Sequence, residues 1–140
     1  MPSLVLDTNV IVSSLRSSLG ASYRIVNLID QGAFDLGLTA SLVLEYEAVC
    51  KRLSGELSIT EAEVDAFVDY LCGVGKRSIV HYQVRPAVHD PDDDMVLEAA
   101  IASGSNWIVT HNVRDLSGSA QFGIEVLTPS QALQRLGVSR

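Results

Sequence analysis

The chain has 140 residues, of which 47% are hydrophobic and 19% are charged, and its formal net charge is −7. This composition indicates a single globular domain over residues 1–140 and excludes a disordered chain. The acidity argues against a protein that holds nucleic acid on a basic face, but it does not exclude acids gathered around metal ions, whose charge would reverse the local sign.

The sequence also predicts where the protein works. No apolar run approaches the ~20 residues of a membrane span, and the chain opens without a signal-peptide pattern, so we expect no membrane partner. Cys50 and Cys72 lie in helical patterns among apolar residues. They are expected to be buried thiols in a reducing compartment, which favours a cytoplasmic protein.

Short apolar runs and helical patterns alternate along the chain. The expected strands are Ser3–Leu6, Phe34–Leu38, Lys76–Val84, Trp107–Val109 and Ile124–Leu127. The expected helices lie at about 10–15, 23–29, 41–53, 61–72, 95–103 and 129–136, with a polar loop around Gly118. This alternation predicts a parallel sheet with helices on both faces.

Several helix ends carry recognisable signals. Asn9 is a candidate N-cap for the first helix, and Thr39 or Ser41 opens the helix after the second strand. Thr60 and Glu63 have the spacing of a capping box, and Gly73 predicts the end of that helix. The two helices on either side of Ser54-Gly55 are expected to pack as an antiparallel pair.

Acids and amides collect where the expected strands end. They are Asp7 after the first strand, Glu45 on the following helix pattern, Asp90, Asp92, Asp93 and Asp94 before the fourth strand, and Asn112 and Asp115 after it. Ligands bind at the carboxyl ends of the strands in open α/β sheets. If the first and fourth strands are neighbours, these side chains therefore meet at one edge.

Such a group of carboxylates needs a cation. Several carboxylates in one partly buried place repel one another, and no lysine or arginine in these motifs is an obvious partner. Hard oxygen ligands suit Mg²⁺ or Mn²⁺ rather than Zn²⁺. A site bound through few carboxylates leaves positions for water and phosphate, and so favours phosphoryl chemistry.

Each of these residues also has a purely structural interpretation. Asp7 would then only cap a helix, Glu45 would be solvated like its neighbour Glu47, and Asp115 would be a surface acid. Asp90 before Pro91 is most simply a turn residue, and at least one acid of 92–94 a helix-dipole partner. The three histidines, at 81, 89 and 111, are not spaced as a ligand set, and the basic residues are mostly solvated charges of which one or two would meet phosphates.

The ordered motifs resemble those of the PIN domain nucleases. The opening VLDTNVIVSSL is similar to the first acidic motif of that family, and TASLVLEYEAVCKRL to the second. The stretch DPDDDMVLEAAIASGSNWIVTHNVRDL resembles the third and fourth motifs. The end, EVLTPSQAL, resembles the closing strand and helix of the subgroup that forms the toxin components of toxin–antitoxin pairs.

The resemblance implies a fold and a set of site residues. The fold is a three-layer α/β/α sandwich with a parallel sheet of about five strands in the order 3-2-1-4-5. Carried over by motif, Asp7, Glu45 and Asp93 are the catalytic acids and metal ligands, with Asp94 as the close alternative to Asp93. Many relatives have Asp where this chain has Asn112, and Asp115 is then a further candidate ligand. Asn9, Thr110 and Asn112 are expected to support the site.

The resemblance also implies the activity: a Mg²⁺- or Mn²⁺-dependent endoribonuclease that hydrolyses RNA phosphodiester bonds by in-line attack of an activated water. Toxin-type relatives are held by a small antitoxin and often form homodimers. Nothing in the sequence identifies the residues that bind nucleic acid. Two alternatives remain. One is a PIN-fold scaffold with weak or no catalysis, which Asn112 favours. The other is a magnesium-dependent phosphotransfer or receiver-like domain, which the absence of any lysine after Lys76 disfavours.

Overall fold

A computed structural model describes residues 1–80 and 91–138, with only the backbone described for residues 91–93. The strands are β1 (Ser3–Leu6), β2 (Asp35–Leu38), β3 (Lys76–Arg77), β4 (Trp107–Val109) and β5 (Glu125–Leu127). They form one parallel sheet in the order β3-β2-β1-β4-β5, with β1 at its centre. The predicted strand order is therefore confirmed.

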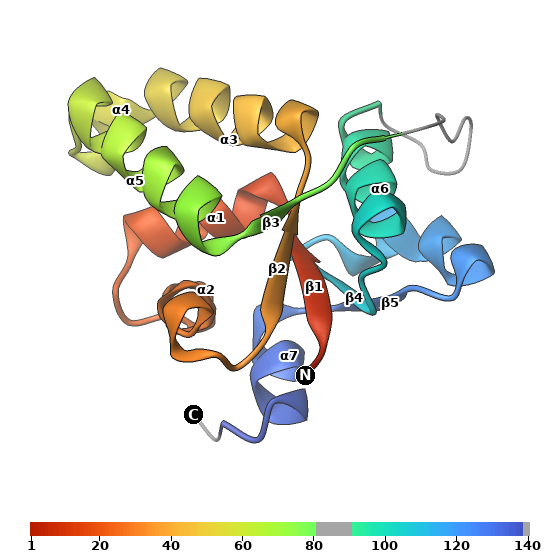
Figure 1. The fold of residues 1–140 in the computed structure, drawn as a ribbon. Helices are drawn as coiled ribbons and strands as arrows, with labels where there is room; N and C mark the ends of the chain where they lie inside the picture. The colour runs from red at the N-terminus through yellow and green to blue at the C-terminus, as the bar shows by residue number, and fades with distance from the viewer. Residues whose placement is uncertain (81–90, 139–140) are drawn as a thin grey trace.

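Helices cover both faces of this sheet. They are α1 (Thr8–Arg16), α2 (Ala21–Asn27), α3 (Ala40–Arg52), α4 (Ser54–Leu57), α5 (Glu61–Val74), α6 (Pro91–Ser103) and α7 (Pro129–Arg135), with 3₁₀ helices η1 (Ile29–Gln31) and η2 (Val113–Phe122). Figure 1 shows α1, α2 and α5 on one side of the sheet and α6 on the other. The predicted α/β/α architecture is thus confirmed.

The core is built on β1. Leu4, Val5 and Leu6 are completely buried, as expected for a central parallel strand covered on both faces. The α6 helix, predicted from its nearly all-apolar sequence, packs against β1 and β2 through buried residues that include Leu97 and Ala100. None of the described helices is long and apolar enough to cross a bilayer.

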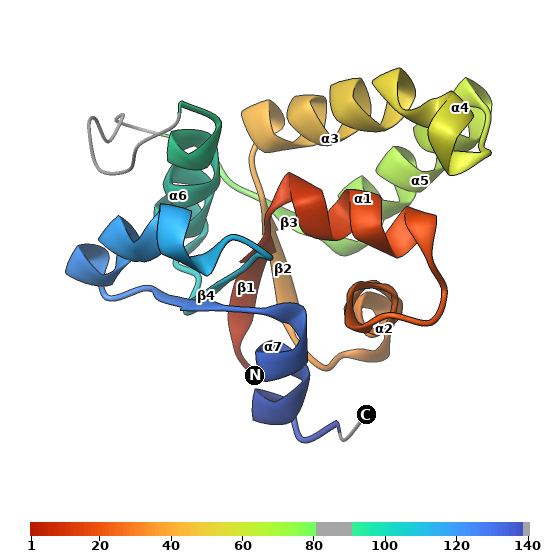
Figure 2. The ribbon, with the colours of Figure 1, turned by 180° about the vertical axis from the view of Figure 1, so that it is seen from behind.

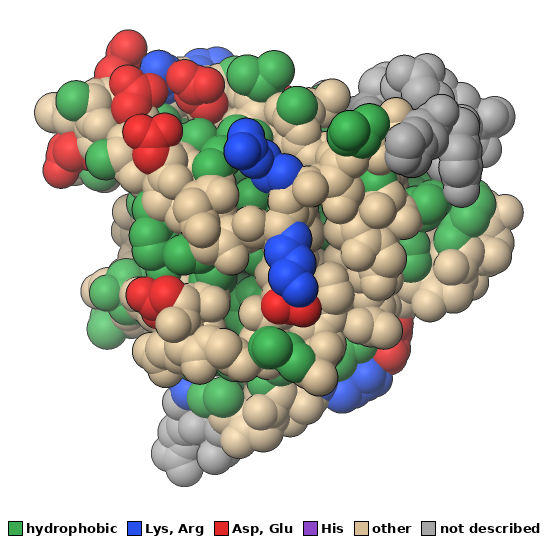
Figure 3. All heavy atoms as spheres, in the orientation of Figure 1, with side chains coloured by type: hydrophobic (Ala, Val, Ile, Leu, Met, Phe, Trp, Pro, Cys, Tyr) green, Lys and Arg blue, Asp and Glu red, His purple; other side chains and the backbone are tan. Residues whose placement is uncertain are grey.

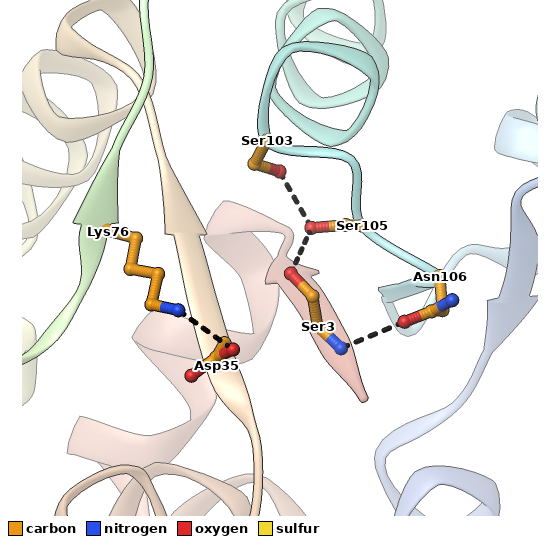
Figure 4. Close-up of polar contacts among 6 residues, drawn as sticks. All are labelled: Ser3, Asp35, Lys76, Ser103, Ser105 and Asn106. Atoms are coloured by element: carbon orange, nitrogen blue, oxygen red, sulfur yellow. Dashed lines mark hydrogen bonds and ion pairs between the residues drawn. The ribbon is translucent and has the colours of Figure 1, made fainter. Parts of the chain in front are cut away.

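The amino ends of β1 and β4 are joined by neutral polar side chains (Figure 4). Ser105 Oγ lies 3.0 Å from Ser3 Oγ and 2.7 Å from Ser103 Oγ. The backbone N–H of Ser3 donates to Asn106 Oδ1 at 3.0 Å. Gly37 on β2 leaves room for this cluster, because a Cβ there would lie only 2.4 Å from Ser103 Oγ.

Some predicted boundaries are wrong. Among the described residues of the predicted strand Lys76–Val84, only Lys76 and Arg77 pair with β2, and residues 81–84 lie outside the described chain, as do His89 and Asp90. The helix expected to end at Gly73 continues to Val74. The helix ends at Gly75, where the chain lies so close to β2 that a Cβ would be only 2.5 Å from Leu38 Cδ1.

Two segments expected to be irregular are helical. Ser54-Gly55, predicted to interrupt two helices, begins the short helix α4. The loop predicted around Gly118 is the 3₁₀ helix η2, which buries Leu116 and Ser119. By contrast, the capping box of Thr60 and Glu63 is present with both of its hydrogen bonds, and α3 and α5 pack together as predicted.

Candidate active site

Asp7 is fixed in space by its own backbone. It directly follows β1, and its N–H donates to the carbonyl of Val109 on β4 at 2.9 Å. Its carbonyl accepts from the N–H of Val10 at 2.9 Å, which starts α1. Asp7 is therefore held between the central strand pair and the first helix, at the carboxyl end of the sheet where the sequence predicted it.

The Asp7 side chain is buried, with 8% of the residue exposed, and it accepts a hydrogen bond from Thr110 Oγ1 at 2.7 Å. Burial raises the pKa of the Asp7 carboxyl above its ordinary value, and the hydrogen bond from Thr110 opposes that shift. The nearby charge of His111 also lowers the Asp7 pKa, whereas the charge of Asp115 raises it. Among the described residues, no lysine or arginine pairs with Asp7.

Thr110 is the centre of a polar cluster at this edge. Its fully buried hydroxyl accepts from Asn9 Nδ2 at 3.3 Å and from the N–H of Asn112 at 3.0 Å. Asn9 Oδ1 in turn accepts from the N–H of His111 at 3.3 Å. The prediction that Asn9 caps the first helix is wrong, because α1 already begins at Thr8 and Asn9 bridges to the segment after β4 instead.

Glu45 lies close to the same edge. It is half-buried on α3, and it lines a groove together with Thr8, Asn9 and His111. Glu47, expected to be the more solvated acid, turns the other way and pairs with Lys51 at 2.8 Å. The fold therefore separates two acids that stand only two positions apart in sequence, and only Glu45 faces the groove.

The remaining predicted acids fall into three cases. Asp94 is 5% exposed in the first part of α6. The side chains of Asp92 and Asp93 lie outside the described part of the chain, so the choice between Asp93 and Asp94 as ligand stays a prediction. Asp115 is exposed in the first turn of η2, near enough to Asp7 to raise its pKa.

The donor chemistry fits a divalent cation. Asp7 is a buried carboxylate, and the acids near it offer oxygen donors, the kind that Mg²⁺ and Mn²⁺ prefer. Among the side chains that the structure describes, however, no three from His, Cys, Asp and Glu lie close enough together to hold an ion. Any ion at this edge would therefore be held by fewer of these residues, or would also use the acids at the start of α6.

Two contacts near the site were not expected from the sequence. The buried hydroxyl of Tyr46 donates to the carbonyl of Leu6, the residue before Asp7. Burial, followed by the charge of Asp7, raises the pKa of Tyr46 well above its ordinary value. His111, predicted to be an ordinary surface histidine, is exposed, but its Nε2 lies 3.0 Å from Ser22 Oγ. The apolar spacing of α3 would have placed Tyr46 in the core, but no sequence signal gave its partner.

The fold and this cluster define a class of protein. A model of the PIN domain matches residues 3–114, most of the chain. The chain therefore belongs to the PIN domain family, and the predicted family resemblance is confirmed.

Two solved structures share the fold. One is VapBC2 from Rickettsia felis bound to a DNA fragment from its promoter. It superposes with a TM-score of 0.62 at 12% sequence identity, covering 89% of this chain and 96% of that chain. VapBC-1 from nontypeable Haemophilus influenzae covers 91% of this chain and 98% of its own, with a TM-score of 0.60 at 13% identity. A comparison with curated proteins gave no match.

Proposed function

We propose that this chain is a Mg²⁺- or Mn²⁺-dependent endoribonuclease that hydrolyses phosphodiester bonds in RNA. The observation that carries the proposal is Asp7, a buried carboxylate at the end of the central strand of a PIN domain, with no lysine or arginine partner in the described part of the chain. A buried charge that costs stability and is not neutralised by a side chain is a frequent feature of functional sites.

The proposed ligands are the predicted ones: Asp7, Glu45 and Asp93, with Asp94 and Asp115 as further candidates. A divalent ion held there would neutralise charge on the phosphate and favour attack by water. Thr110 has a separate task, because its hydroxyl holds Asp7 Oδ2 in one orientation and opposes the shift toward the protonated form. Asn9 and Asn112 support Thr110 through the two hydrogen bonds that its oxygen accepts.

The proposed biological role is supported by the resemblance of the sequence motifs. The proposed role is the toxin of a toxin–antitoxin pair, acting in the cytoplasm as a homodimer and held by a small antitoxin. The similarity of the closing motif EVLTPSQAL to toxin-type PIN domains supports this role. The fold shared with the two VapBC proteins, at low identity, is compatible with it.

A second candidate is a PIN-fold scaffold with weak or no catalysis. Asn112 stands where many relatives have an acid, and the described acids do not converge as a metal-binding group of three. Isothermal titration with Mn²⁺ separates the two candidates. The nuclease is expected to bind Mn²⁺ and to lose affinity on Asp7→Asn, whereas a scaffold would show no metal binding that depends on Asp7.

The decisive experiment is cleavage of a single-stranded RNA with Mn²⁺ or Mg²⁺ by Asp7→Asn and Asp93→Asn variants. Both substitutions are expected to abolish cleavage while circular dichroism shows a retained fold. Glu45→Gln is expected to do the same, and Glu47→Gln is the matched control, because Glu47 contacts Lys51 instead of the groove. Undiminished cleavage by both aspartate variants would overturn the proposal.

A further inference from the structure

A groove of about 490 Å³ lies between α1 and α3, which run side by side in Figure 2. One end begins at the candidate site, with Thr8, Asn9, Glu45 and His111. The other end holds Arg16 and Arg52, the last residues of the two helices. Because α1 has nine residues and a helix rises ~1.5 Å per residue, the basic end lies roughly 12 Å along the groove from Thr8.

Arg52 and its neighbour Lys51 have different environments. Lys51 contacts Glu47 and Asp65 at 2.8 Å each, and these hydrogen bonds to Asp65 and Glu47 raise its pKa above the ordinary value. Arg52 lines the groove, is exposed, and has no ion-pair partner among the described residues. Its guanidinium is therefore available to an anion that enters the groove.

Arg16 is held less firmly than its contact suggests. It pairs with Glu56 of α4, but the two side chains are 53% and 61% exposed. Exposed ion pairs contribute little, so a phosphate in the groove can compete with Glu56 for Arg16. The basic end of the groove thus offers two guanidinium groups, one of them already oriented by an acid.

The distribution of charge restricts where a polyanion can lie. The chain has a net charge of −7, and Figure 3 shows acidic side chains gathered over α4 and α5 on the face it presents. The exposed acids of these helices are Glu56, Glu61, Glu63, Asp65 and Asp69. An RNA strand that reaches Asp7 is repelled from that surface, and the groove gives it a path that ends on two arginines.

We propose that the α1–α3 groove carries the backbone of single-stranded RNA away from the candidate site, with Arg52 and Arg16 contacting phosphates beside the cleaved one. The proposal rests on the proposed endoribonuclease function and adds the direction in which the substrate lies. Because these are contacts to phosphates, they set affinity and position without selecting sequence.

The test measures RNA binding separately from cleavage. Fluorescence anisotropy with a labelled polyuridylate oligonucleotide in EDTA gives the Kd at a series of salt concentrations between about 50 and 200 mM. Arg52→Gln is expected to raise Kd about tenfold, the effect of losing one charge-assisted hydrogen bond. It should also reduce the slope of log Kd against log salt by about 0.7, as for one lost phosphate contact to a single strand.

Matched variants separate a contact from a change in net charge. Arg77→Gln removes the same charge from β3, outside the groove, and is expected to leave the salt slope at the wild-type value. Arg52→Lys keeps the charge and should retain most of the slope. Glu56→Gln releases Arg16 and should tighten binding, whereas Asp69→Asn on α5 is its matched control.

The results distinguish this proposal from the proposed function. A wild-type Kd and slope in Arg52→Gln would overturn the groove proposal even if Asp7→Asn abolishes cleavage. Absence of RNA binding by the wild-type protein would also overturn it. If Arg52→Gln weakens binding of a polyglutamate peptide but not of RNA, the groove belongs to an acidic protein segment, which contradicts the proposal. Retained cleavage by Asp7→Asn with a reduced slope in Arg52→Gln would overturn only the metal-site assignment.

Discussion

The strand pair β1–β4 has a polar cluster at each of its two ends, and the two clusters differ in charge. At the amino end, Ser3, Ser103, Ser105 and Asn106 exchange neutral hydrogen bonds (Figure 4). At the carboxyl end, roughly 13 Å away at ~3.3 Å per residue, the same two strands place Thr110 against the buried charge of Asp7. The polar groups of the neutral cluster are paired by hydrogen bonds. In the charged cluster, burial of the Asp7 carboxylate has a desolvation cost that its hydrogen bond from Thr110 does not fully offset.

This difference allows stability and the proposed function to be tested separately. A neutral network needs only its own partners, so its residues should affect folding and not catalysis. A buried carboxylate is penalised by desolvation, and ionisable groups shifted in this way are frequent at functional sites. Substitutions at each end therefore test whether the two clusters can be disturbed independently.

The largest effect is expected from Thr110→Val at the carboxyl end. This substitution keeps the shape but removes the donor to Asp7 and the acceptor for Asn9 and Asn112. Metal-dependent cleavage should fall about 10- to 100-fold, and the free energy of unfolding by about 1–3 kcal/mol. Thr110→Ser keeps the hydroxyl and should restore most of both. Normal activity in Thr110→Val would show that Asp7 does not need this partner.

At the amino end, Gly37→Ala is expected to cost stability alone. The new Cβ would lie 2.4 Å from Ser103 Oγ and 2.8 Å from Ser103 Cβ, so the cluster must shift. Urea unfolding should show a loss of about 1–3 kcal/mol. Gly73→Ala in α5 is the control, because a Cβ there meets nothing within 4 Å, and it should stabilise by about 0.5–1 kcal/mol. Reduced cleavage by folded Gly37→Ala would contradict the separation of the two ends.

A smaller loss is expected from Ser105→Ala. Its buried hydroxyl bridges Ser3 and Ser103, so its removal should lower the free energy of unfolding by about 1 kcal/mol. Ser130→Ala on the exposed surface of α7 is the comparison and should stay within about 0.5 kcal/mol of wild type. Cleavage rates of both variants, measured below their unfolding transitions, should equal the wild-type rate.

The last expected effect is a dependence of the free energy of unfolding on pH in the metal-free protein. Since burial raises the Asp7 pKa, the folded state binds this proton more tightly than the unfolded state. The contribution of Asp7 to stability therefore decreases as the pH rises from its ordinary pKa of 3.8 through its folded pKa. Asp7→Asn removes this loss, so its stability relative to wild type should increase with pH. Denaturant titrations with EDTA across that range measure the difference in unfolding free energy between Asp7→Asn and wild type. If the prediction is wrong, this difference would be the same at every pH.

Much of the fold was predictable from the sequence because it depends on short-range patterns. The apolar run before Asp7, the capping box of Thr60 and Glu63, and the apolar sequence of α6 each gave the right element. The errors lie where a distant contact decides. The helix α5 ends at Gly75, which lies close against Leu38 of β2, and not at Gly73, and η2 is helical where only a polar loop was expected.

The candidate site divides in the same way. The sequence determined that Asp7 follows a buried strand and that Glu45, the acids at 92–94 and Asp115 are its possible companions. Only the tertiary structure decided that Asp7 bonds to Thr110, because the two residues are 103 positions apart and meet only when β1 and β4 pair. It also decided that Arg52, adjacent to the ion-paired Lys51, lies in the groove. A helix turns successive side chains to different faces, and the packing of α1 and α5 against α3 determines what each face meets.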